Sequence, residues 1–185
     1  DLLPLLEPLR GKLASVELIV VGCEAGGFQT TLPNAVDWED FIGSEPADYR
    51  WPELDENAPM GLCYTSGTTG NPKGVMYTHR STYLHTMAQA MTDAMALSAT
   101  DSVCGIVPMF HAMGWGLPFS ATMLGAKQVM PHRFMDPKSL LDLIAAEQVT
   151  ISAGVPTIWQ GARAALEAEP ERWDLSQLQR LTCGG

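Results

Sequence analysis

The sequence predicts an α/β fold built mainly on parallel sheet. Short apolar segments of strand type alternate with helical segments, signals for tight hairpins are few, and 46% of the 185 residues are hydrophobic. Because parallel strands are joined by crossover helices, this alternation is typical of such sheets. The hydrophobic content is ample for a packed core.

The predicted strands are short apolar runs in which β-branched residues recur. They are Val16–Val21, Met60–Tyr64, Val75–Tyr77, Val103–Val107, Lys127–Met130, Val149–Ala153 and Leu181–Cys183. Gly22–Pro33 is glycine-rich and is predicted to be a loop. Gly43–Pro59 carries three prolines and many acids and is predicted to lie on the surface.

Helices are predicted between these strands. They are Leu2–Leu13, Val36–Ile42, Thr78 to about Met95, Gly116–Leu124, Asp136 to Glu147, and Pro156 to about Ala168. Thr78 is a predicted N-cap, and Asp136-Pro137 is a typical N-cap and first-turn pair. The methionine stripe Met87, Met91 and Met95 is interpreted as a seam packed on a sheet, with a flexible binding surface as the alternative.

The formal charge is −10, from 11 basic and 21 acidic residues. Such a charge argues against nucleic acid as a partner and against an anionic membrane surface. No apolar run approaches the ~20 residues of a membrane span, and no signal sequence opens the chain. We therefore expect a cytoplasmic protein with no integral membrane segment.

The cysteines are far apart in the sequence and form no Cys-x-x-Cys pair. They are Cys23, Cys63, Cys104 and Cys183. Free thiols are therefore expected, in preference to disulfides or zinc ligands.

Residues 64–75 read Tyr-Thr-Ser-Gly-Thr-Thr-Gly-Asn-Pro-Lys-Gly-Val, between two apolar flanks. Glycines let the backbone approach a ligand closely, and successive N–H groups in a turn form an anion site. Lys73 adds a mobile positive charge. The segment therefore predicts a loop that binds a polyphosphate, and an ordinary surface turn is the alternative.

The loop is not a Walker P-loop, which needs Gly-Lys-Ser/Thr leading into a helix. Here Lys73 follows Pro72 and precedes Gly74, and a short β-prone stretch comes next. The phosphates of a nucleotide would therefore not lie on a helix N-terminus.

Thr65–Gly74 resembles the phosphate-loop signature of the adenylate-forming enzymes, which include acyl-CoA synthetases, luciferases and peptide-synthetase adenylation domains. Further stretches are similar to this family in the same order. They are Val75–Arg80, Pro108–Trp115, which resembles the fatty acyl-CoA synthetase branch, Gly154–Thr157 and Cys183–Gly185. The resemblance spans the chain from about Val16 to its end.

The resemblance implies that a carboxylate attacks the α-phosphate of ATP, and that the acyl adenylate then passes its acyl group to coenzyme A. Preorganised donors and Mg²⁺ must stabilise the departing pyrophosphate. The residues expected to bind the phosphates are Thr65, Ser66, Gly67, Thr68, Thr69, Gly70 and Lys73. Thr65 is also the candidate Mg²⁺ ligand, although a carboxylate must complete the metal site.

The resemblance places His111 beside the acyl carboxylate, where it would orient that group. Lys73, through its charge at the phosphates, and His111 are the expected catalytic residues. A structural histidine is the alternative. Trp115 is expected at the mouth of a fatty-acyl tunnel, or in the core, and Gly184 and Gly185 are expected near the acyl adenylate, or in a turn. His79, His85 and His132 show no metal-ligand spacing and are interpreted as structural or solvated.

The family resemblance implies that residues 1–185 are a fragment of a large N-terminal domain. Residues up to about 120 would form one α/β subdomain and residues from about 121 would begin a second. The chain has no initiator Met and stops directly after a predicted strand, so we expect it to be cut at both ends. The C-terminal lid domain and its lysine, the Mg²⁺ carboxylate and the ribose ligand would be absent.

The expected function of the parent is activation of a medium- or long-chain fatty acid with ATP and CoA, with a homodimer as its possible state. The fragment alone is expected to be inactive. The alternatives are a non-catalytic phosphate-binding segment, or an adenylation enzyme for a short thioether or aryl acid or for loading a carrier protein.

Overall fold

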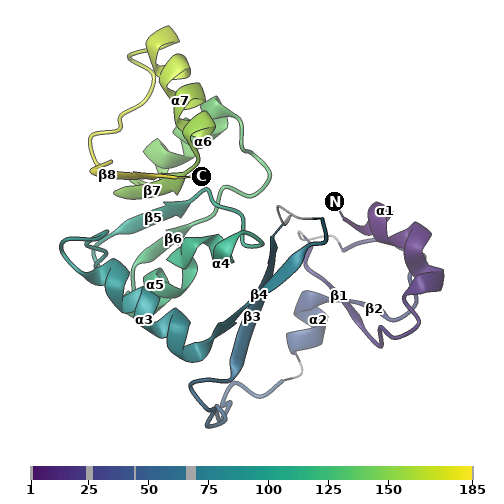
Figure 1. Cartoon of the computed structure of the whole chain (residues 1–185). Helices are drawn as coiled ribbons and strands as arrows, with labels where there is room; N and C mark the ends of the chain where they lie inside the picture. Colours follow the sequence, from purple (N-terminus) through teal and green to yellow (C-terminus); the bar gives the residue numbers. More distant parts are fainter. Residues whose placement is uncertain (1, 24–26, 44, 66–69, 185) are drawn as a thin grey trace. The chain divides into compact units, whose positions relative to one another are not determined.

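The computed structural model describes the chain except residues 1, 24–26, 44, 66–69 and 185. The chain forms two compact units, Asp1–Glu53 and Leu54–Gly185 (Figure 1). The predicted division near residue 120 stays a prediction. Strands from both sides of that position share one sheet in the second unit.

The first unit is small and contains one parallel strand pair. Its elements are α1 (Leu3–Leu6), the 3₁₀ helix η1 (Glu7–Lys12), β1 (Ile19–Val21), β2 (Ala35–Asp37) and α2 (Trp38–Gly43). The predicted helix Leu2–Leu13 is therefore split. Pro8 near the start of η1 has no N–H to donate, which favours a change of helix type there.

The predicted helix Val36–Ile42 is wrong in its first two residues. Residues 35–37 pair with β1 in parallel, and the helix begins only at Trp38. The pairing with a strand distant in sequence decides the local conformation, which a short window of sequence does not contain.

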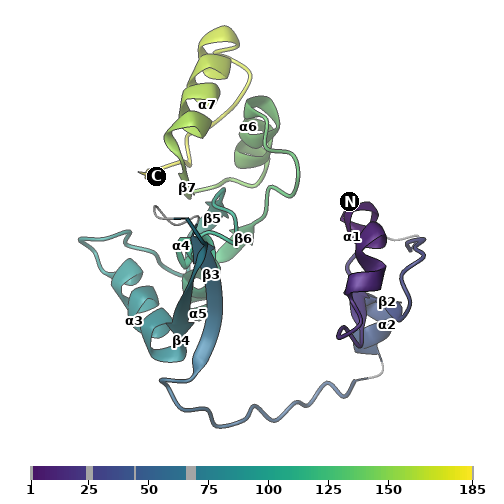
Figure 2. The same ribbon diagram turned by 45° about the vertical axis from the view of Figure 1, so that its right-hand side comes forward.

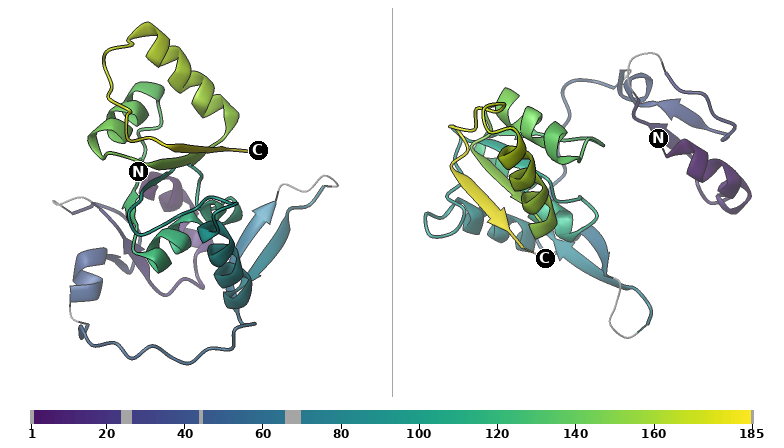
Figure 3. Two further views of the ribbon diagram at one scale, coloured as in Figure 1. Left: turned by 90° about the vertical axis from the view of Figure 1, so that its left-hand side faces the viewer. Right: turned by 90° about the horizontal axis from the view of Figure 1, so that it is seen from above.

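The second unit is organised around a four-stranded parallel sheet in the order β6-β5-β7-β8, which confirms the predicted fold class. Its strands are β5 (Ser102–Gly105), β6 (Lys127–Val129), β7 (Ile151–Gly154) and β8 (Arg180–Cys183). The yellow strand β8 lies at the edge of this sheet in the right-hand view of Figure 3.

Helices cover both faces of this sheet. On one face α5 (Leu117–Leu124) packs through Leu117 and Ala121 against Val103 and Ile151. On the other, α6 (Pro137–Ala146) and α7 (Pro156–Ala168) pack over a cluster centred on Cys104. Figure 1 shows α6 and α7 above the strands and α5 below them. Adjacent residues of β5 therefore point into opposite layers, as strand geometry requires.

The one antiparallel pair among the described strands is the hairpin of β3 (Pro59–Thr65) and β4 (Lys73–Thr78), seen edge-on in Figure 2. The sequence predicted both strands but not that they pair with each other. At the end of β4, Thr78 caps α3 (His79–Ala90), as predicted. Its Oγ1 accepts from the Ser81 amide at 3.1 Å, and the Ser81 hydroxyl accepts from the Thr78 amide at 3.0 Å.

The methionine stripe does not form the predicted seam. α3 ends at Ala90, Met87 and Met91 are exposed, and only Met95 packs against the core. The buried side chains of α3 are Thr86 and Gln89, which are tolerated inside because both are hydrogen-bonded.

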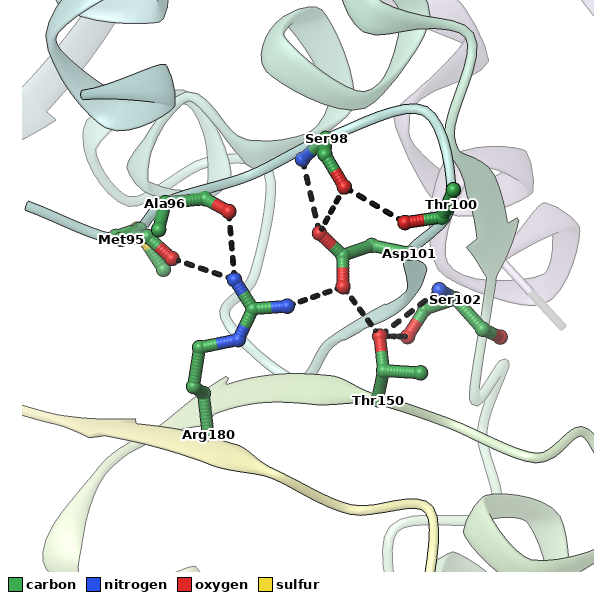
Figure 4. Close-up of polar contacts among 8 residues, drawn as sticks. All are labelled: Met95, Ala96, Ser98, Thr100, Asp101, Ser102, Thr150 and Arg180. Atoms are coloured by element: carbon green, nitrogen blue, oxygen red, sulfur yellow. Dashed lines mark hydrogen bonds and ion pairs between the residues drawn. The ribbon is translucent and has the colours of Figure 1, made fainter. Parts of the chain in front are cut away.

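A polar network ties together the amino ends of β5, β7 and β8 (Figure 4). The guanidinium of Arg180 pairs with Asp101, which is 4% exposed, and donates to the carbonyls of Met95 and Ala96 at 2.9 and 2.6 Å. Thr150 Oγ1 donates to the same carboxylate at 2.7 Å. The network holds three strands and the loop before β5 in one arrangement.

Candidate functional site

The predicted phosphate loop connects the two strands of the hairpin. Thr65 is the last residue of β3 and is paired in register with Lys73, the first residue of β4. The Thr65 hydroxyl lies 3.5 Å from the Lys73 carbonyl oxygen. The structure therefore brings together two predicted site residues at the base of the loop. Ser66, Gly67, Thr68 and Thr69 lie outside the described residues.

Gly70 shows why the loop needs glycine. Its φ is +120°, a conformation that side-chain-bearing residues rarely adopt, and it lies on the exposed return arm of the loop. Lys73 is also exposed, and among the residues that the structure describes no carboxylate pairs with its ammonium group. Its charge is therefore available to an external anion.

His111 lies beyond the carboxyl end of β5, where parallel sheets place their ligand sites. Its backbone is extended, its side chain is exposed, and its amide donates to the Pro108 carbonyl at 3.0 Å. Within the described chain its imidazole has no hydrogen-bond partner. The exposed ring is accessible to a ligand, and none of the described residues supplies the backbone hydrogen bond of the structural alternative.

The short helical turn α4 (Ala112–Trp115) follows His111 and was not predicted. Its residues are left-handed: φ is 46° at Ala112, 55° at Met113, 63° at Gly114 and 55° at Trp115, and the next residue, Gly116, has φ of 73°. For residues other than glycine this conformation costs about 1–2 kcal/mol each. Surrounding contacts must therefore stabilise the turn.

Two sets of contacts do so. The Met113 side chain packs beside Gly61 of β3, with its sulfur 3.4 Å from Sγ of the buried Cys63, and occupies the space that a Cβ at residue 61 would need. The Trp115 carbonyl accepts from Gln89 Nε2 at 2.8 Å and lies 3.0 Å from His85 Nε2. Since a carbonyl only accepts, that nitrogen of His85 must carry a proton.

Trp115 and Gly184, both predicted as substrate residues, are neighbours in the structure. A Cβ built on Gly184 would lie 3.2 Å from Cη2 of the Trp115 ring. Gly184 follows the carboxyl end of β8, and so belongs to the same edge of the sheet as His111. Gly185 lies outside the described residues.

A pocket of about 330 Å³ lies beside the left-handed turn. Its walls come from the end of β4, the first turns of α3, the turn itself and α5. They include Tyr77, Thr82, His85, Met113, Trp115 and Phe119. The walls are mainly apolar, with few polar groups, as is common for a site that holds a hydrophobic ligand.

The part that α3 takes in lining this pocket was not predicted from the sequence. His85, interpreted as structural or solvated, is exposed and lies 3.0 Å from the Trp115 carbonyl, and it also lines the pocket. Gln89 was not singled out. The two residues are four apart on one helix and therefore face the same direction. The four-residue spacing of His85 and Gln89 on a predicted helix was the feature of the sequence that could have indicated this shared face.

The described residues contain no group of three His, Cys, Asp or Glu side chains that could hold a metal ion. Thr65 alone would be a weak ligand for Mg²⁺. The Cys104 thiol is not accessible as a nucleophile. Cys104 is fully buried in the sheet, and this burial raises the pKa of its thiol to about 11.

The AMP-binding enzyme family matches residues 5–185. The chain belongs to the AMP-binding enzyme family. It is 45% identical over 184 residues to a medium-chain-fatty-acid–CoA ligase of Ectopseudomonas oleovorans, covering 99% of this chain and 33% of that protein. It is 41% identical to a 3-methylmercaptopropionyl-CoA ligase of Ruegeria pomeroyi, covering 99% of this chain and 34% of that protein.

A solved structure of an anthranilate CoA ligase in complex with anthranoyl-AMP has the same fold. Its TM-score is 0.79 at 25% identity, covering 98% of this chain and 34% of that one. The present chain thus spans about a third of the length of the relatives it matches. In the part of the chain that the structure describes, no helix is long and apolar enough to cross a membrane.

Proposed function

We propose that the full-length protein carrying this chain is an AMP-forming acid–CoA ligase. The observation that carries the proposal is the hairpin in a chain of the AMP-binding family. It presents Thr65 and the exposed Lys73 at the base of a glycine- and hydroxyl-rich loop. The chain supplies the phosphate loop and one wall of the acid site. The isolated chain is expected to be inactive.

In the first step, a carboxylate oxygen of the acid attacks the α-phosphorus of ATP, and the bond from that phosphorus to the bridging oxygen of pyrophosphate breaks. The carboxylate is already ionised at neutral pH, so the step needs no general base. It needs groups that stabilise negative charge on the leaving group. We assign this role to Lys73, Thr65 and Gly70, and to the intervening residues Ser66, Gly67, Thr68 and Thr69.

In the second step, the CoA sulfur attacks the acyl carbonyl carbon and AMP leaves. Mg²⁺ would supply charge neutralisation at the phosphates. Thr65 is its proposed ligand in this chain, and residues elsewhere in the full-length protein must complete the coordination. A homodimer and a cytoplasmic location are proposed for the full-length protein as well.

The acid site is proposed to lie at the carboxyl edge of the sheet. His111 would donate to the substrate carboxylate, and Trp115, Gly184 and Gly185 would border the acyl group. The apolar pocket next to Trp115 favours a medium or long aliphatic acid. The 41% identity to a ligase of a short thioether acid makes such an acid the second candidate.

The test is acid-dependent exchange of labelled pyrophosphate into ATP by the full-length protein, with a panel of aliphatic and thioether acids. Lys73→Ala and Thr65→Ala should each lower exchange by about 100-fold, because each removes a donor to the leaving group. Both side chains are exposed, so the variants should remain folded.

Lys127→Ala and Thr100→Ala are matched controls outside the site and should exchange at the wild-type rate. Undiminished exchange in both loop variants would refute the assignment of the loop. If only the short thioether acid supported pyrophosphate exchange, the aliphatic acid would be rejected as the substrate and the thioether acid accepted in its place.

A further inference from the structure

Gln89 is a buried polar residue of α3 that donates to the Trp115 carbonyl. It is 7% exposed and lies on the face of α3 that packs toward α5. The amide of Gln89 is oriented unambiguously. Its Nε2 faces the Trp115 carbonyl, which only accepts, and its Oε1 faces the Ser120 hydroxyl, which donates to it.

Ser120 completes this cluster. It is fully buried in α5, and its Oγ lies within hydrogen-bond distance of both Gln89 and the Gly116 carbonyl, at 3.1 Å from the latter. Gln89 also directs Nε2 to the Met95 sulfur at 3.3 Å. The amide is therefore bonded at both ends, and its position is fixed by α5 and by the segment that follows α3.

The contact with the Trp115 carbonyl acts on a strained part of the chain. Each residue from Ala112 to Gly116 is left-handed, so the turn depends on contacts of this kind for its shape. The backbone at Trp115 determines where its indole lies between the 330 Å³ pocket and the backbone of Gly184. A substitution of Gln89 would therefore affect acid binding by moving the Trp115 indole, and not by removing a contact between Gln89 and the substrate.

We propose that Gln89, supported by Ser120, is a positioning residue that fixes Trp115 and thereby sets which acids the site accepts. The selectivity part of this inference depends on the proposed function. The positional part depends only on the hydrogen bonds described above.

The informative variant is Gln89→Met in the full-length protein, because methionine keeps the length and buried character of the side chain but donates no hydrogen bond. Ser120→Ala is the second variant, since it removes the support of the amide with little change in volume. The control is Thr86→Val on the same helix. Thr86 is buried too, at 2% exposed, and among the described residues its hydroxyl donates to the Thr82 carbonyl, one turn earlier.

The position of Trp115 is measured by ¹⁹F NMR of protein labelled with 5-fluorotryptophan, with the Trp115 signal assigned by its loss in Trp115→Phe. Gln89→Met should shift or broaden that signal, Ser120→Ala should do so less, and Thr86→Val should leave it in place. An unchanged Trp115 signal in folded Gln89→Met would overturn the proposal.

Selectivity is measured as kcat/KM for acids of increasing chain length. Gln89→Met should change the ratio between the longest and shortest accepted acids by about tenfold, with the KM for ATP within about twofold of wild type. A uniform loss for all acids, equal to that of Thr86→Val, would show a merely structural role and overturn the proposal. A wild-type protein that activates no acid would refute the proposed function, whereas the ¹⁹F signal would still decide whether Gln89 fixes Trp115.

Discussion

At the amino ends of β5, β7 and β8, polar side chains bond to one another around the buried Asp101 carboxylate, whereas beyond the carboxyl end of β5 the His111 side chain faces solvent. Asp101, Thr150 and Arg180 form the polar network. His111 lies beside the left-handed turn. The amino ends of these strands thus hold the sheet together, whereas the segment after β5 presents the residue that we propose to contact the acid.

Arg180→Met removes the cation from the polar network at the amino ends of the strands. The variant leaves the Asp101 carboxylate, 4% exposed, without its cation. We expect a loss of about 3 kcal/mol in the free energy of unfolding, measured by urea denaturation of the full-length protein. The KM values of the folded variant for acid and ATP should stay at wild-type levels.

The control for this prediction is Arg163→Met. Arg163 pairs with Glu167 on the exposed face of α7, with 80% of its side chain accessible. Its loss should change stability by less than about 0.5 kcal/mol. If the two substitutions lowered the free energy of unfolding equally, the Arg180 network would stabilise the fold no more than an ordinary surface ion pair does.

His111→Ala tests the opposite end of the sheet. We expect the KM for the acid to rise about tenfold, because a donor to the carboxylate is lost, while the KM for ATP changes less than about twofold. Stability should change by less than about 0.5 kcal/mol, since the side chain is exposed. His132→Ala is the matched control, and a selective loss of ATP affinity in His111→Ala would contradict the assigned role.

The ionisation of Asp101 is expected to make the free energy of unfolding depend weakly on pH. Burial raises the pKa of this carboxyl, but hydrogen bonds from Thr150 and Ser98 and the charge of Arg180 outweigh burial and hold the pKa below its usual value. A group whose pKa is lower in the folded state than in the unfolded state stabilises the fold above about pH 4. That contribution is lost as the pH falls through the folded-state pKa.

Urea midpoints of the full-length protein between pH 3 and pH 7 measure this contribution. Asp101→Asn should be less stable than wild type at pH 7, and the difference should shrink as the pH falls below about 4. A difference that stays constant over this range would mean that ionisation of Asp101 does not contribute.

Much of the fold followed from local pattern. The capping signals at Thr78 and Asp136 and the apolar runs of β5 and β7 are properties of short segments, and the structure has them where expected. The predictions failed where contacts with segments distant in the sequence determine the local structure. β2 forms because β1 lies beside it, and α3 buries Thr86 and Gln89 because polar partners are present inside.

The site shows the same limit. Thr65 and Lys73 stand in a motif, and their pairing follows once the hairpin forms. The turn at Ala112–Gly116 could not be read from the sequence, because Ala112, Met113 and Trp115 seldom adopt left-handed backbone. The side chains that stabilise it come from α3 and β3, remote in sequence.

The register of the hairpin also sets which strand residues an inserted residue would move. Because Thr65 and Lys73 face each other across the two strands, a residue inserted between them lengthens only the connection. One residue inserted within β4 would invert every side chain beyond it and turn Tyr77 away from the pocket that it lines. Homologues should therefore keep the length of β4, and those that bind phosphate through this loop should keep the length of the connection as well.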